Sequence, residues 1–203
     1  MIGYWRSTAV LVMACLLVCG GCATTKVVES WKDPSVTGPL RFKKILVIVV
    51  HPETYTRRAA EDELVKQIGA DRAIPGDQIL TDADRADVQK VKAKVKQSGV
   101  DGVVTMRLGG ATTRTAASPG YEPYGYESMW NDYDRDMSAG DRSSGGVHST
   151  NVLSIRTRIY SVADEKLVWT GVSDVIDPKH VRQIMADVAK AVGKRLREEH
   201  LIQ

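Results

Sequence analysis

The chain contains the segment Lys43-Lys44-Ile45-Leu46-Val47-Ile48-Val49-Val50, in which two lysines precede six consecutive aliphatic residues. A strand with one wet face alternates apolar and polar residues, whereas a strand covered on both faces stays apolar. Strands of the second kind are typical of parallel sheets, whose faces are covered by helices. The segment therefore predicts the central strand of a parallel sheet.

The residues that follow this strand predict a helix over residues 54–68. Ala60, Leu64 and Ile68 recur one helical turn apart, and Thr54 is a candidate cap at the start. A short strand with a turn is expected within residues 70–80.

A second helix is expected to start at Asp82 or Asp84 and to stop at Gly99, and residues 100–108 then form a third strand. The order strand, helix, strand, helix, strand favours parallel pairing with right-handed crossovers.

The second half of the chain changes character. Residues 151–162 alternate, as in a strand with one wet face, and residues 167–175 are expected to return beside it as a hairpin. Asp177-Pro178 supplies a cap and a first-turn proline for a C-terminal helix. Its apolar stripe is formed by Val181, Ile184, Met185, Val188, Val192 and Leu196. The expected fold is α/β, with a single mixed sheet from a β-α-β-α-β unit followed by an antiparallel hairpin and a C-terminal helix.

The first 21 residues have the pattern of a bacterial lipoprotein signal peptide. Arg6 is their single charge, residues 8–18 are mostly apolar, and Gly20-Gly21 precede Cys22. The apolar run is too short for a membrane span, which needs about 20 residues. Cys19 is the weaker candidate for acylation because the bulky Val18 precedes it. We expect cleavage before Cys22 and acylation of its thiol.

Three regions follow from this reading. Residues 1–21 are the signal peptide, residues 22–41 a lipidated N-terminus with a short tether or edge strand, and residues 42–203 the α/β domain. The domain carries a Gly/Tyr-rich insert at residues 109–149.

Charge gives no indication of a nucleic-acid partner. The chain has 28 basic and 25 acidic residues, and its closest approach to a basic stripe is Lys90, Lys92, Lys94 and Lys96. In a helix successive lysines of this set lie about 200° apart, so the four do not form one stripe. We expect no nucleic-acid binding. The four histidines are scattered, and no phosphate loop is present, so neither a metal nor a cofactor is expected.

Two regions hold candidate contact residues. The insert has rings suited to a protein, glycan or lipid partner, because each combines contact area with a polar tip; they are Tyr121, Tyr124, Tyr126, Trp130 and Tyr133. The alternative is a low-complexity loop without enough apolar mass to fold.

The second region is the carboxyl end of the central strand, where open α/β sheets place ligands. His51 and Thr54 follow that strand, and Arg107 lies near the end of the third. These three residues form a candidate ligand edge, and the alternative is an ordinary solvated loop.

Several motifs together resemble a family of small, uncharacterised lipoproteins of Gram-negative bacteria. The most specific are Ser30-Trp31-Lys32-Asp33-Pro34 and Lys166-Leu167-Val168-Trp169. The resemblance implies an α/β domain similar to the amino-terminal domain of the translocation protein TolB, and no known activity. Ala23 after the cysteine is similar to the pattern sorted to the outer membrane.

We therefore expect a non-catalytic binding or assembly module, anchored to the outer membrane through Cys22 and facing the periplasm. Its expected partner is an envelope protein or a glycan. The alternative is a small-molecule binding protein or weak enzyme with a site near His51.

Overall fold

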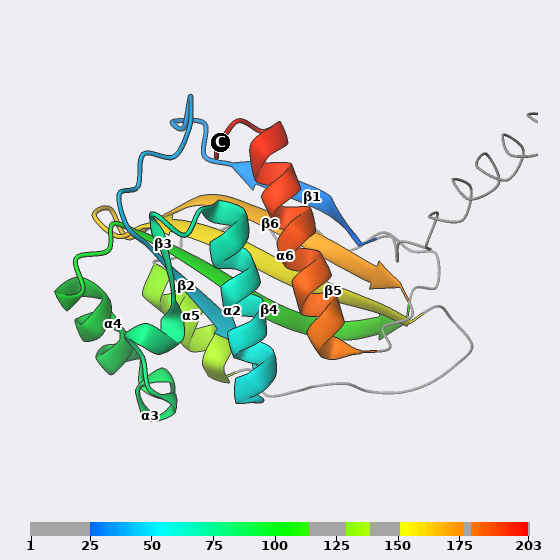
Figure 1. Ribbon diagram of the computed structural model, residues 1–203, viewed down its shortest axis with the longest axis horizontal. Helices are drawn as coiled ribbons and strands as arrows, with labels where there is room; N and C mark the ends of the chain where they lie inside the picture. The colour runs from blue at the N-terminus through cyan, green and yellow to red at the C-terminus, as the bar shows by residue number, and fades with distance from the viewer. Residues whose placement is uncertain (1–24, 114–128, 139–150, 177–179, 203) are drawn as a thin grey trace, which may run out of the picture.

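The computed structural model describes residues 25–113, 129–138, 151–176 and 180–202. Six strands within these residues form one mixed sheet in the order β1-β6-β5-β4-β2-β3 (Figure 1). The strands are β1 (Lys26–Lys32), β2 (Ile45–Val50), β3 (Ala73–Pro75), β4 (Gly102–Thr113), β5 (Asn151–Ser161) and β6 (Lys166–Ile176). The helices are α2 (Thr54–Ile68), α3 (Asp82–Arg85), α4 (Val88–Gln97), α5 (Met129–Ser138) and α6 (Val181–Glu198), with a 3-10 turn, η1, at Gly76–Gln78. None of the described helices has the length and apolar character needed to cross a membrane.

The predicted strand over residues 45–50 is confirmed, but its predicted central position is wrong, because β2 is the fifth of six strands and only the short β3 lies beyond it. The first five residues of β2 are buried, and the strand pairs in parallel with β3 on one side and β4 on the other. The pairs β4–β5, β5–β6 and β1–β6 are antiparallel, so the predicted hairpin is confirmed. β1 forms an edge strand of the sheet, which is one of the two alternatives given for residues 22–41. The fold class is α/β with a single mixed sheet.

Helices cover the two faces of the sheet unequally. On one face α2 and α6 pack on residues of every long strand, including Val49, Met106 and Ile155 (Figure 1). On the other face α4 and α5 pack around Leu46 and Ile48 of β2. The second group of helices covers only the end of the sheet near β2.

The third strand is longer than predicted. β4 runs to Thr113 because it continues to pair with β5 beyond an irregularity between Leu108 and Ala111. Residues 109–113 therefore belong to the sheet, and the predicted start of the insert at residue 109 is wrong. The insert also contains a helix, α5.

Helix capping accounts for two further differences. The single helix expected after residue 82 is two helices, because Thr81 caps α3 and the Asp87 carboxylate accepts hydrogen bonds from the first amides of α4. Thr54 is the first residue of α2 and does not cap it; Glu53 occupies the N-cap position. α6 starts at Val181, and the predicted cap at Asp177-Pro178 lies outside the described residues.

Candidate functional site

The predicted ligand edge is a hydrogen-bonded network of polar groups. His51 follows β2, and its Nδ1 accepts a hydrogen bond from the Glu53 amide at 3.1 Å. The buried Arg57 donates to the His51 carbonyl at 3.2 Å and to the Thr54 hydroxyl at 3.3 Å. It also forms an ion pair with Asp82, which accepts a hydrogen bond from Thr54. These groups join the start of α2 to the start of α3, and their hydrogen-bonding capacity is largely used within the network.

A buried ion pair lies behind this edge. Glu61 of α2 is fully buried, and its Oε1 accepts hydrogen bonds from the Val49 amide and from Arg85 Nη2, both at 3.0 Å. Its Oε2 faces the Asp77 amide at 3.3 Å. Burial raises the pKa of Glu61 above its ordinary value, and the Arg85 guanidinium opposes this shift. The pair fastens α2 to β2, η1 and α3.

Only glycine fits beside this pair. A Cβ at Gly76 would lie 2.8 Å from Arg85 Nη2, 2.9 Å from the Val47 carbonyl oxygen and 3.0 Å from Glu61 Oε1. The backbone of η1 can therefore approach the two charged groups directly. One feature of the sequence indicates that these charged residues are buried. Arg57 and Glu61 lie on the same helical stripe as the apolar Leu64.

Arg107 lies on the face of the sheet turned away from α2 and α6. Its neighbours Met106 and Leu108 both contact the core that those helices cover, so the alternation of a strand turns Arg107 to the opposite face. It pairs in register with Val50 on one side and with Arg156 on the other. The structure therefore brings His51 and Thr54 together and places Arg107 on a different surface.

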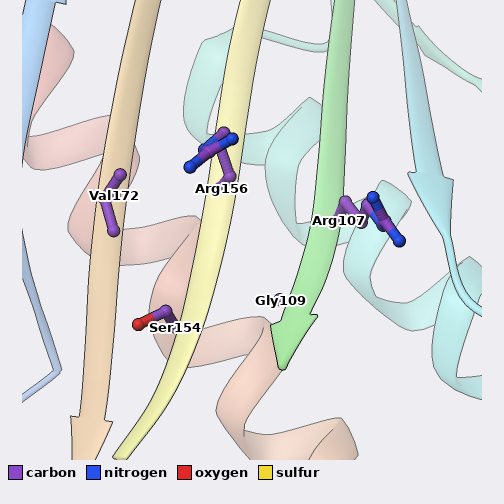
Figure 2. A pocket seen from close by; sticks show the side chains of 5 residues that line it. All are labelled: Arg107, Gly109, Ser154, Arg156 and Val172. Carbon is purple, nitrogen blue, oxygen red and sulfur yellow. The ribbon is translucent and has the colours of Figure 1, made fainter. Parts of the chain in front are cut away.

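That surface contains a shallow depression of about 140 Å³. It is lined by Arg107 and Gly109 of β4, Ser154 and Arg156 of β5, and Val172 of β6 (Figure 2). Arg156 is exposed, and the other four residues are half-buried. We call these five residues the arginine face.

The arginine face places two like charges on neighbouring strands. Arg107 and Arg156 are direct cross-strand neighbours, an arrangement in which like charges disfavour pairing. The Ser154 hydroxyl donates to Asp174 at 2.8 Å, so one acidic group adjoins the depression. Guanidinium groups suit carboxylate, phosphate or sulfate oxygens. The wet side of residues 151–162 indicated Arg156 in the sequence, but nothing there indicated that Arg107 would lie opposite.

The aromatic residues of α5 are part of the core. Trp130 is 7% exposed and Tyr133 is 5% exposed. The Tyr133 hydroxyl donates to the Arg85 carbonyl at 3.3 Å, and burial raises the pKa of Tyr133 to about 12. Their predicted role as contact residues is wrong, because the sheet and α4 cover these two rings. Tyr121, Tyr124, Tyr126 and Cys22 lie outside the described residues.

The described part of the chain contains no cluster of metal-ligating side chains. No group of three or more histidine, cysteine, aspartate or glutamate side chains gathers there in a way that could hold an ion.

Comparison with known proteins shows similarity of fold alone. No known family and no curated protein matches the chain. Two structures of the PelC dodecamer from Paraburkholderia phytofirmans are 11% identical, cover 85% and 83% of this chain and 96% of their own, and give TM-scores of 0.45 and 0.43. The lipoprotein GNA1162 from Neisseria meningitidis is 14% identical, with coverage of 76% and 98% and a TM-score of 0.35. No functional argument rests on these similarities.

Proposed function

We propose that this chain is a lipid-anchored protein of the bacterial envelope that binds a partner through the arginine face and catalyses no reaction. The anchor is an acylated Cys22, and Ala23 after it favours the outer membrane with the domain in the periplasm. The partner is an envelope protein or glycan that presents anionic groups. The observation that carries the proposal is the unequal covering of the sheet, which leaves two opposed arginines on a face that no described helix covers.

Binding is favoured over catalysis by the kind of groups on this surface. The arginine face offers guanidinium donors, one hydroxyl and backbone, and the hydroxyl already donates to a carboxylate. A nucleophile needs an adjacent base to activate it, and the Ser154 hydroxyl contacts an acidic acceptor in place of a histidine. The alternative site at His51 receives less support, because its neighbours are engaged with one another.

The experiment reverses the charge of one exposed arginine. Tagged wild type, Arg156→Glu and Arg41→Glu are expressed in the native host, crosslinked in intact cells and purified for quantitative mass spectrometry. Arg41 is the matched control, because it is an exposed arginine in the loop before β2. Both changes are at the surface, so each should alter stability by about 0.5 kcal/mol or less.

We expect at least one envelope component to be recovered with wild type and Arg41→Glu and to be lost with Arg156→Glu. Identical partner lists for the three proteins would contradict a role for the arginine face.

A further inference from the structure

Exposed apolar side chains gather at one end of the molecule. Among the described residues, five large hydrophobic side chains are exposed: Val28 at 43%, Tyr55 at 61%, Met137 at 37%, Ile176 at 59% and Val181 at 39%. All except Met137 lie at the start of β1, the end of β6, or the first residues of α2 and α6. A surface residue of this kind needs no explanation singly, but a group of four at one end marks a contact surface.

These segments lie at the same end of the fold. Lys26 of β1 pairs with Asp174 near the end of β6, and only four residues separate Ile176 from Val181. Arg182 of α6 donates to the Tyr55 hydroxyl at 2.6 Å, which joins the starts of α6 and α2. Figure 1 shows the arrowhead of β6 and the start of β1 on the right, with the orange start of α6 and the cyan start of α2 below them.

The same end carries basic groups suited to lipid phosphates. Lys26 and Arg182 are exposed, and the Arg182 guanidinium lies 5.2 Å from the centre of the Tyr55 ring. Tyrosine beside a basic side chain is typical of the boundary between headgroups and acyl chains, because both side chains combine an apolar body with a polar tip. Of the acidic residues at this end, Asp174 is buried, and Glu29 and Glu53 are exposed.

The short tether favours the bilayer as the binding partner of this surface. Three residues separate Cys22 from Lys26, and they span at most about 10 Å at about 3.5 Å per residue. The start of β1 is therefore held close to the acyl chains on Cys22. The bilayer is therefore the surface nearest to the start of β1.

We infer that the end formed by Val28, Tyr55, Ile176 and Val181 lies on the phospholipid surface, with Lys26 and Arg182 at the lipid phosphates. This inference rests on the anchor at Cys22 that we proposed above. The strands then run away from the bilayer, and the arginine face is accessible from the side, to components that stand in or on the same membrane.

The test measures depth of insertion at two positions of the acylated full-length protein. Ile176→Cys and Gln97→Cys, an exposed residue at the end of α4, are each labelled with an environment-sensitive fluorophore. The proteins are reconstituted in vesicles of phosphatidylethanolamine and phosphatidylglycerol that contain lipid-borne quenchers. The thioether on Cys22 prevents labelling there.

We expect blue-shifted, quenched emission from position 176 and solvent-like emission from position 97. Solvent-like emission at both positions, from protein that floats with the vesicles, would overturn the inference and leave the anchor in place. Protein that fails to float and has a reactive Cys22 thiol would overturn the anchor and the inference together.

A second variant checks that the apolar side chains cause the orientation. With the fluorophore at Tyr55→Cys, the double substitution Ile176→Glu and Val181→Glu is compared with Met137→Glu, which changes the exposed apolar residue on a different surface. We expect the double substitution to lower the inserted fraction by at least about tenfold, because burial of even one of the two aliphatic side chains corresponds to about that factor. Met137→Glu should leave it unchanged, and equal values for the two variants would contradict the inference.

Discussion

The carboxylate of Glu61 is the most heavily used polar group in the described core. It accepts hydrogen bonds from β2 and Arg85 through one oxygen and faces the Asp77 amide with the other. A fully buried charge is costly unless it is paired, and the pairing partner Arg85 is itself 6% exposed. Neither residue touches the arginine face, so their role is structural.

Glu61→Gln is expected to destabilise the protein by about 3–5 kcal/mol, because it leaves the Arg85 guanidinium buried without a counter-charge. Equilibrium urea unfolding of the soluble domain measures this change. The double variant Glu61→Leu with Arg85→Met should recover part of the loss, since two apolar side chains replace the ion pair while the Val49 and Asp77 amides lose their acceptor. A Glu61→Gln variant as stable as wild type would show that the pair contributes little.

The ionisation of Asp84 makes the free energy of unfolding depend on pH in the acid range. Its carboxylate accepts hydrogen bonds from the Lys94 ammonium at 2.6 Å and from Thr81, and these contacts hold the pKa of Asp84 far below its ordinary value of 3.8. Because the pKa is lower in the folded protein, the stabilisation is present above pH 3.8 and is lost as the pH falls toward the folded value.

We expect the urea midpoint of wild type to fall as the pH is lowered below 3.8, and the fall to be smaller in Asp84→Asn. Lys94→Met removes the principal cause of the lowered Asp84 pKa and should also make the urea midpoint depend less on pH. Parallel pH profiles for the three proteins would count against this assignment.

The helix α5 shows how a short element can be held by tertiary contacts. Met129, Trp130 and Tyr133 lie on one side of it and are buried against Leu46, Ile48 and the apolar stripe of α4. Lys92 of α4 also lies 5.4 Å from the Trp130 ring. The flanking residues are rich in glycine, tyrosine and serine, so the sequence indicated a loop where one helix completes the core.

Trp130→Ala is expected to destabilise the protein by about 3–5 kcal/mol, the usual cost of removing a buried aromatic side chain. Met137→Ala, on the exposed part of the same helix, should cost about 0.5 kcal/mol or less. Thermal and urea unfolding compare the two variants with wild type. Similar small effects for both would mean that α5 adds nothing to the core.

The elements predicted best are those whose pattern is long and regular. The bounds of α2 agree with the prediction, and the stripe of Ala60, Leu64 and Ile68 is buried as expected. The end of β4 was missed because pairing with β5 carries it through Gly109 and Gly110, which locally indicate a loop. The break between α3 and α4 was missed because a single cap, Asp87, interrupts an otherwise helical pattern.

Across the molecule, the proposed bilayer contact and the proposed partner contact lie on different surfaces of one fold. The ends of β1 and β6 with the starts of α2 and α6 form the surface assigned to the bilayer, and the middle strands carry the arginine face. Because the tether is short, a partner of the arginine face must approach close to the membrane. Partners confined to the same membrane meet this requirement most easily.

Sequence alone was enough to establish the class of fold, the buried strand β2, the hairpin and the order of the main elements. These features depend on apolar periodicity. The periodicity is local in the chain, so it can be recognised without knowing which elements pack together. The burial of Glu61, the docking of Trp130 and the pairing of Arg107 with Arg156 depended on tertiary contacts. Each of them joins residues far apart in the chain, and the choice between core and surface for a polar or aromatic side chain is made by the elements that pack against it.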